Sequence, residues 1–367
     1  MTTILPIVGM TMLVALIGSL VLTPWLRRLA LAARVLDRPN HRKIHRAPIP
    51  KLGGVAVFLA WLVAVGLGGT LAVMREMDFL MKVAPIVIAA TCGVALGLWD
   101  DVRDLPGKWK LFGQLLIGLL LVSGGVQIDR ISNPFGGEIV FPEWLSISVT
   151  LLWVAGMMNA VNLIDGLDGL AAGVVAIASV GLVVAGLQAQ NFFSIVVFAA
   201  LAGACGGFLA YNFFPARIFL GDAGSQFLGV ILAAAPLMDF PYKSATAVAL
   251  LIPLTSLALP IYDTWLALLR RFRGRRSVFR ADKYHLHHRL LNMGLSHRQV
   301  VSFCYLVSLY LSCLAFVFVL IQERHALILL VLLALGWLMA MQTLRFIEFA
   351  LRRRARRRTR IGAPARR

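Results

Sequence analysis

The sequence predicts an all-α integral membrane protein, a polytopic bundle of about eleven transmembrane helices. Two properties of the whole chain predict this class: its 367 residues are 59% hydrophobic and only 14% charged, and its mean hydropathy is +0.82. A third observation is that apolar runs close to the roughly 20 residues of a membrane span recur along its length. Uninterrupted apolar runs without two-residue alternation indicate helices rather than barrel strands.

The first predicted span covers residues 4–22. No positive charge precedes it, and Arg27 and Arg28 follow it, which is typical of an uncleaved anchor rather than a signal peptide. Further apolar runs predict the other spans in chain order: 53–74, 83–99, 111–126, 145–161, 170–187, 192–210, 225–238, 244–268, 300–321 and 326–344. Between the fourth and fifth spans, residues 127–144 predict a short hairpin around "NPFGGE".

Lysine and arginine are distributed unevenly between the two sets of loops that eleven spans create. The set formed by residues 23–52, 100–110, 211–224, 269–299 and the tail from 345 holds 31 of the 36 basic residues, and the other set holds 5. Because short cytoplasmic loops carry the excess of basic residues, the N-terminus is predicted outside and the C-terminus in the cytoplasm.

We expect one membrane-embedded domain over residues 1–344 and a basic cytoplasmic tail over residues 345–367. The arginines of the tail are typical of a solvated anchor near anionic lipid. No aromatic or motif context accompanies them, so nucleic-acid binding is not predicted. The four cysteines fall inside predicted spans without metal-binding spacing, which favours a packing role.

Acidic residues gather in three short loops of the face that carries most of the basic residues. Asp100 and Asp101 end the third span, "NLIDGLDGL" ends the fifth, and "FLGDAGSQ" precedes the eighth. Two ionised carboxylates about 4 Å apart repel by about 4 kcal/mol at an effective dielectric of 20, so an adjacent pair requires a cation. Oxygen ligands favour Mg²⁺, with Mn²⁺ as the alternative, and the lack of Cys or Glu near "HLHH" disfavours zinc.

The polar residues in "NLIDGLDGL" are spaced by three, which turns successive side chains about 60° backward around a helix. Gly166 and Gly169 permit the helix to break there. We therefore expect Asn162 and Asp165 to face a cleft together and Asp168 to brace the loop.

Further groups on this face suit a polyanion. Asp222 is predicted just before the N-terminus of the eighth span, whose free N–H groups are expected to receive phosphate oxygens. The last large loop supplies a cationic and hydrogen-bonding set, although an HxHH tract can also be a structural turn. The set consists of His285, His287, His288 and the arginines of this loop. Carboxylates for a metal, a basic loop for phosphate and a surrounding membrane together predict phosphoryl transfer at the bilayer surface.

Five ordered motifs resemble those of the polyprenyl-phosphate N-acetylhexosamine-1-phosphate transferases, glycosyltransferase family 4. They are "DRPNHRKIHRAPIPKLGG", "GLWDD", "NAVNLIDGLDGLAAG", "RIFLGDAGS" and "HLHHRLL", from about residue 37 to 295. Leu286 interrupts the histidines, which resembles the WecA and TagO branch rather than the MraY branch.

The resemblance implies transfer of an N-acetylhexosamine 1-phosphate from a UDP-sugar to undecaprenyl phosphate with release of UMP. UDP-GlcNAc is the favoured donor, with UDP-MurNAc-pentapeptide or another UDP-N-acetyl sugar as alternatives. This reaction would initiate lipid-linked glycans of the cell envelope, such as lipopolysaccharide O-antigen or teichoic acid. The resemblance also implies that the protein lies in the bacterial inner membrane, with its active site on the cytoplasmic face. The oligomeric state is open, a homodimer included.

Carried over by motif, the resemblance implies four catalytic aspartates. Asp100 corresponds to the candidate base that deprotonates or orients the lipid phosphate. Asp101 and Asp222 correspond to magnesium-site residues, and Asp165 to a position near uridine and metal.

The remaining implied residues bind substrate. Lys51 matches a basic position near the diphosphate, and Asn162 matches a position near uridine and metal. Asp168, in the same motif, is also expected to bind substrate. Arg280 and the three histidines would hold sugar and phosphate oxygens. A one-step in-line attack and a two-step route through an aspartyl-phosphate both remain open.

Two other classes compete with this hypothesis. A transporter would place ionisable residues near the middle of spans, where this chain is nearly free of charge. A CDP-alcohol phosphotransferase would carry a compact acidic signature on consecutive helical turns, whereas these acids come from three separated loops.

Overall fold

A computed structural model describes residues 4–38, 47–73, 78–132, 138–238, 290–291 and 293–320. Within these ranges the chain is helical apart from two pairs of short strands. The helices are α1 (Ile4–Ala32), α2 (Gly53–Val73), α3 (Phe79–Arg103), α4 (Gly107–Ser123), α5 (Glu143–Ile164), α6 (Leu170–Ala189), α7 (Phe192–Asn212), α8 (Gly221–Met238) and α12 (His297–Leu320).

Each of these helices coincides with one of the predicted spans. Six helices of the described part are long and apolar enough to cross a membrane: α1, α2, α3, α5, α6 and α7. This confirms a helical protein of the multi-pass membrane type, while the number of eleven and the orientation remain predictions. The predicted spans 244–268 and 326–344 and the basic tail lie outside the described residues.

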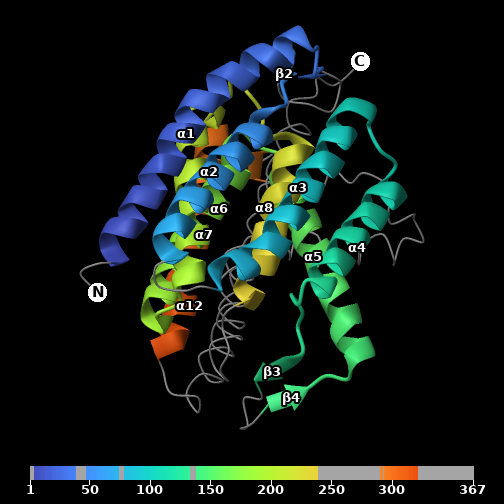
Figure 1. Ribbon diagram of the computed structural model, residues 1–367. Helices are drawn as coiled ribbons and strands as arrows, with labels where there is room; N and C mark the ends of the chain where they lie inside the picture. The colour runs from blue at the N-terminus through green and yellow to red at the C-terminus, as the bar shows by residue number, and fades with distance from the viewer. Residues whose placement is uncertain are drawn as a thin grey trace, which may run out of the picture.

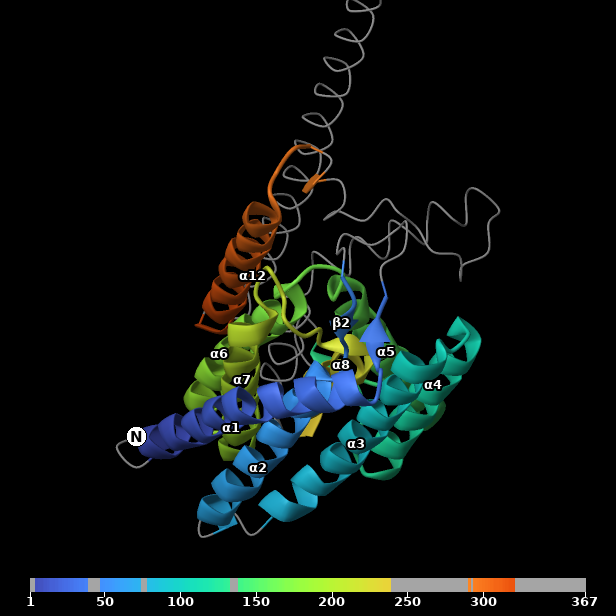
Figure 2. The same ribbon diagram turned by 90° about the horizontal axis from the view of Figure 1, so that it is seen from above.

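The helices surround α8, which lies near the centre of the bundle (Figures 1 and 2). It packs mainly on α3 and α5, and also on α2. Every residue from Ala223 to Pro236 is buried, as expected for a helix that is apolar over most of its surface. On one side of the bundle α7 packs on α1, α2 and α6, and α6 in turn contacts α12.

The two strand pairs lie at opposite ends of the bundle (Figure 1). β3 (Arg130–Ser132) and β4 (Glu138–Val140) form an antiparallel pair, which confirms the hairpin predicted in the loop 127–144. β1 (Leu36–Asp37) pairs with β2 (Ile49–Pro50) at the other end. The carboxyl end of α3 and the start of α8 lie at this second end, so the predicted acidic motifs meet there.

Glycines allow α2, α3 and α8 to approach closely at the β1–β2 end. A Cβ added at Gly97 of α3 would lie 2.2 Å from the carbonyl oxygen of Asp222. A Cβ at Gly54 of α2 would lie 2.1 Å from the backbone of Gly224. The small residues therefore determine how near the start of α8 comes to α3.

The Gly97→Ala variant is expected to be less stable and less active, because its methyl group must displace the first turn of α8. Overpacking of this kind costs about 1–3 kcal/mol. The Gly156→Ala variant is the control, since a Cβ there meets nothing within 4 Å and alanine is the better helix former by roughly 0.5–1 kcal/mol. Thermal unfolding of the two detergent-solubilised variants measures the difference, and equal melting temperatures would contradict this account of the α3–α8 contact.

Candidate active site

Asp101 fixes the first turn of α8. Its Oδ1 accepts a hydrogen bond from the backbone N–H of Asp222 and its Oδ2 one from Ala223, both at 3.0 Å. Gly221 has φ +73°, and a Cβ there would lie 2.7 Å from Asp101 Oδ2, so only glycine suits this position. The expectation that these N–H groups are free for phosphate is wrong, because a carboxylate from α3 already satisfies them.

Asp100 lies beside Asp101 in sequence but has different partners. The Leu105 N–H donates to its Oδ1 at 2.7 Å, and Lys110 Nζ lies 2.7 Å from its Oδ2. The backbone turns sharply between these residues, because Asp104 ends α3 in the left-handed conformation with φ 48°. This turn directs the start of α4 back toward the end of α3, which places Lys110 against Asp100.

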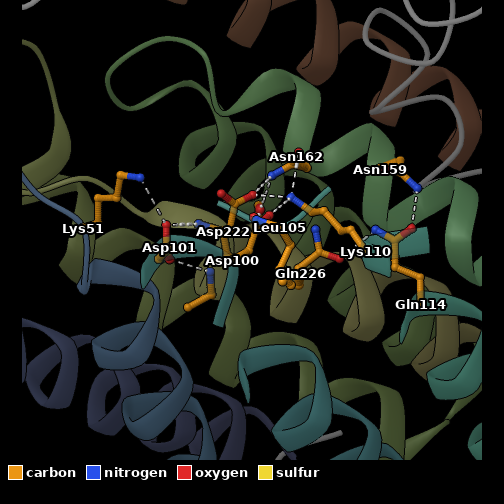
Figure 3. A network of polar contacts seen from close by, with 12 residues as sticks. Lys51, Asp100, Asp101, Leu105, Lys110, Gln114, Asn159, Asn162, Asp222 and Gln226 are labelled. Atoms are coloured by element: carbon orange, nitrogen blue, oxygen red, sulfur yellow. Dashed lines mark hydrogen bonds and ion pairs between the residues drawn. The ribbon is translucent and has the colours of Figure 1, made fainter. Parts of the chain in front are cut away.

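Lys110 is the central cation of the cluster (Figure 3). Its Nζ lies 2.5 Å from Asp222 Oδ1 as well as 2.7 Å from Asp100 Oδ2, and it donates a longer hydrogen bond of 3.4 Å to Asn162 Oδ1. Its side chain is only 13% exposed, whereas that of Asp222 is 26% exposed. The carboxylates of α3 and α8 thus converge on one cation position that solvent reaches mainly past Asp222.

Asn162, near the end of α5, completes the cluster. Its Nδ2 donates to Asp222 Oδ1 at 2.5 Å and to Ser225 Oγ at 2.8 Å. Because the amide oxygen faces Lys110 and the amide nitrogen faces Asp222, the orientation of this side chain is fixed. Helices α3, α4, α5 and α8 each contribute one polar group to the same point.

Lys51 approaches Asp101 from the opposite side to Lys110 (Figure 3). Its Nζ lies 3.8 Å from Asp101 Oδ1 and 3.5 Å from Asp37 Oδ1. Burial alone would lower the pKa of Lys51, but the carboxylates of Asp101, Asp37 and Asp222 outweigh it and raise the pKa. Lys51 is therefore a permanent positive charge at the edge of the cluster.

The chain holds Lys51 in place through its backbone. The N–H groups of Gly53 and Gly54 donate to the carbonyls of Phe219 and Leu220 at 3.0 and 2.7 Å, and Phe219 N–H donates to Pro50. Lys51 therefore lies next to the loop that leads into α8.

The loop between α5 and α6 positions Asp165 and Asp168 differently. α5 ends at Ile164 and Gly169 has φ +78°, so the helix breaks where Gly166 and Gly169 predicted. Although Asp165 keeps some contact with solvent, its enclosure by protein raises its pKa well above the usual range. The charges of Asp222 and Asp101 raise the pKa further, against a hydrogen bond from the Gly221 backbone.

Asp168 braces this loop, as predicted. Its Oδ2 accepts a hydrogen bond from the Ala216 N–H at 2.9 Å. Asn212 links the same two loops, because its Oδ1 accepts from Gly169 N–H and its Nδ2 donates to the Ile218 carbonyl. Tyr305 of α12 also donates its hydroxyl hydrogen to the Gly169 carbonyl.

The structure brings most of the described predicted residues to one end of the bundle, but not into one cluster. Contacts link Asp100, Asp222 and Asn162 through Lys110, and Asp101 and Lys51 adjoin them. Asp165 interacts with this group through its charge, whereas Asp168 holds a loop. The predicted Arg280, His285, His287 and His288 lie outside the described residues.

Sequence reasoning missed Lys110 as a site residue. The signal was its place in "DDVRDLPGKWK", just before an apolar run and on the predicted cytoplasmic face. Neighbouring Lys108 has the same sequence signal but is exposed, so the sequence alone could not choose between the two.

The donor set suits a hard divalent cation. Among the described residues no group of three or more His, Cys, Asp or Glu side chains could hold a metal ion. One or two carboxylates are what Mg²⁺ commonly takes from a protein, the other ligands being water and substrate phosphates. Asp100 and Asp222 both face one cation and Asp222 is partly exposed, so these oxygens fit the protein's share of such a magnesium site.

Comparison with known proteins gives the same class of chemistry. The model of the family described as glycosyl transferase family 4 matches residues 83–239. The matched part contains the Asp100–Asp101 pair, Lys110, Asn162 and Asp222.

Curated relatives match most of the chain. A probable undecaprenyl-phosphate N-acetylglucosaminyl 1-phosphate transferase of Bacillus subtilis is 36% identical over 83% of this chain and 83% of its own length. A decaprenyl-phosphate N-acetylglucosaminephosphotransferase of Mycolicibacterium smegmatis is 37% identical over 82% of this chain and 79% of its own. A phospho-N-acetylmuramoyl-pentapeptide-transferase of Desulforudis audaxviator is 32% identical over 86% of this chain and 97% of its own.

Proposed function

Because the chain belongs to glycosyl transferase family 4, we propose that it transfers N-acetylglucosamine 1-phosphate from UDP-N-acetylglucosamine to undecaprenyl phosphate and releases UMP. The observation that carries this proposal is the convergence of Asp100, Asp222 and Asn162 on Lys110. Such a cluster is suited to positioning phosphate groups and neutralising their charge, which is most of what phosphoryl transfer requires.

The reaction exchanges one phosphoanhydride for another. An oxygen of the lipid phosphate forms a bond to the phosphorus that carries the sugar. The bond from that phosphorus to the bridging oxygen breaks, and UMP leaves with the electron pair. No oxidant, reductant or further energy source is needed, so the protein must mainly align two anions that repel each other.

The residues divide this task between them. Asp100 is held by Leu105 and Lys110, which aims one carboxylate oxygen at the cation position, where it can orient or deprotonate the incoming lipid phosphate. Lys110 and Lys51 bring two positive charges to the phosphates from opposite sides of the cluster. Asp101 holds the first turn of α8 and thereby sets the position of Asp222.

Asp222 and Asp100 would hold a Mg²⁺ ion, with Mn²⁺ as the alternative. We propose Asp100 in place of the predicted metal residue Asp101, because both carboxylate oxygens of Asp101 accept backbone N–H groups of α8. When bound, the metal supplies charge neutralisation to the diphosphate. Lys110 Nζ occupies this cation position in the structure, so with a metal held there the lysine would be available to pair with a substrate phosphate.

The donor sugar follows from the relatives. Those of Bacillus subtilis and Mycolicibacterium smegmatis are named for N-acetylglucosamine, and the one of Desulforudis audaxviator for N-acetylmuramoyl-pentapeptide. The higher identity to the first two favours N-acetylglucosamine. We further propose that the protein lies in the bacterial inner membrane with its site on the cytoplasmic face. The bacterial relatives and the predicted cytoplasmic location of the basic loops support this proposal.

Purified protein is expected to release UMP only when a UDP-N-acetyl sugar, a polyprenyl phosphate and Mg²⁺ are all supplied. Activity should disappear with a chelator and return with added Mg²⁺. A panel of UDP-sugars assayed at equal concentration identifies the donor. Release of UMP without lipid, or no release with any donor, would contradict the proposal, and flux of an ion through reconstituted vesicles would favour a transporter instead.

A further inference from the structure

A second polar layer lies directly beneath the ionic cluster. On α4, Gln114 follows Lys110 by four residues, and on α8, Gln226 follows Asp222 by four. On α5, Asn159 precedes Asn162 by three. Residues three or four apart share one face of a helix, so three of the four helices that form the cluster, α4, α5 and α8, each present one amide a turn deeper in the bundle (Figure 3).

These amides form a chain with a defined direction. Asn159 Nδ2 donates to Gln114 Oε1 at 2.6 Å and also to the Ala155 carbonyl at 2.8 Å. Gln114 Nε2 donates to Gln226 Oε1 at 2.8 Å. Reversing the Gln226 amide would place two N–H donors against each other, so its nitrogen must point away from Gln114.

This series of amide hydrogen bonds ends at Gln226 in an N–H donor that has no acceptor. Gln226 and Gln114 are both 0% exposed, yet Gln226 Nε2 has no hydrogen-bond partner among the residues that the structure describes. A buried donor without an acceptor is unfavourable, so a native protein that keeps one needs a reason such as a bound ion, water or ligand. Figure 3 shows this nitrogen on the side of Asp100 and Lys110 rather than on the side of Gln114.

The two anionic substrates of the proposed reaction approach the cluster from different directions. A nucleotide sugar comes from water and meets the cluster past Asp222, its more exposed carboxylate. A lipid phosphate comes from the bilayer, and Gln226 lies one helical turn, about 5.4 Å, deeper than Asp222. An N–H donor beneath the cation position is thus placed for an oxygen of the lipid head group.

We propose that Gln226 binds the phosphate of the polyprenyl acceptor through Nε2, and that Gln114, held by Asn159, positions it. This inference rests on the proposed function. Hydrogen bonds to charged groups are stronger than those between neutral groups, and Gln226 provides one without adding another charge to the site.

The Gln226→Met variant tests this directly, because methionine keeps the length of the side chain but cannot donate. We expect kcat/KM for polyprenyl phosphate to fall by about tenfold or more, the effect of losing one hydrogen bond to a charged group. At saturating lipid, kcat/KM for the UDP-sugar should stay unchanged. Gln188→Met is the matched control, because Gln188 is an exposed residue of α6.

Two further variants separate binding from a purely structural role. Gln226→Glu keeps an oxygen to which Gln114 can donate, so kcat/KM for polyprenyl phosphate would recover if Gln226 had only a structural role. If Gln226 binds the phosphate, the ionised carboxylate would repel it and lower kcat/KM further. Gln114→Met should give a smaller loss in the same parameter. Melting temperatures show that each variant is folded.

The outcomes are distinct. Wild-type activity that depends on lipid, combined with an unchanged kcat/KM for lipid in Gln226→Met, overturns the inference but leaves the proposed function standing. A fall in kcat/KM confined to the UDP-sugar would mean that the Gln226 N–H group binds the nucleotide sugar, and this result also overturns the inference. Absence of wild-type activity with any polyprenyl phosphate rejects the proposed function itself.

Discussion

Replacing Lys110 by methionine is expected to lower turnover by about a hundredfold or more, the loss typical of removing one preorganised group that stabilises developing charge. Lys110 Nζ lies within 2.7 Å of carboxylates from two different helices. Without it, Asp100 and Asp222 lose the cation that they share, and both repel an incoming phosphate. The rate of UMP release at saturating substrates measures the effect.

Lys108→Met provides the control for this experiment. Lys108 lies two residues earlier on the same helix, carries the same charge and is exposed, so its loss should leave turnover unchanged. Lys110→Arg should recover only part of the activity, because a planar guanidinium cannot replace a compact ammonium between two carboxylates. Equal turnover in Lys110→Met and Lys108→Met would show that the central cation has no role in the reaction.

The sequence predicted the helices well and their ends less well. The apolar runs identify each described helix, because lipid requires about 20 apolar residues regardless of the packing around them. α1, however, continues to Ala32 and α3 to Arg103, beyond the apolar runs that end at residues 22 and 99. An apolar run shows which residues lie within the lipid, whereas a helix continues for as long as its backbone hydrogen bonds are made. At these two helix ends the hydrogen bonds continue beyond the apolar residues.

For the site, the sequence identified the carboxylates but not their partners. Repulsion between Asp100 and Asp101 predicted a need for a cation. The structure supplies two lysines, Lys110 to one carboxylate and Lys51 to the other. Which lysine pairs with which carboxylate depends on the turn after α3 and on the close approach of α8 to Gly97. Both are set by how the helices pack, so the sequence pattern does not reveal them. For the same reason Asp101 was not foreseen as the group that satisfies the start of α8.

The Asp222→Asn variant is expected to lose turnover by about a thousandfold or more while remaining folded. Asparagine keeps an oxygen that can accept from Lys110 and Asn162, so the cluster stays hydrogen-bonded. It removes the negative charge that we propose helps bind the metal at the most exposed point of the site. Asp104→Asn is the matched control, because Asp104 is exposed with φ 48° and asparagine tolerates that conformation.

A double variant tests whether Asp222 and Lys110 act as one unit. If each works only through the other, Asp222→Asn combined with Lys110→Met should be no slower than the worse single variant, since residues of one catalytic unit show strongly non-additive losses. Independent roles would instead multiply the two losses. Turnover of Asp222→Asn at the level of Asp104→Asn would remove this carboxylate from the mechanism, and would leave Asp100 with Lys110 as the pair that orients the lipid phosphate.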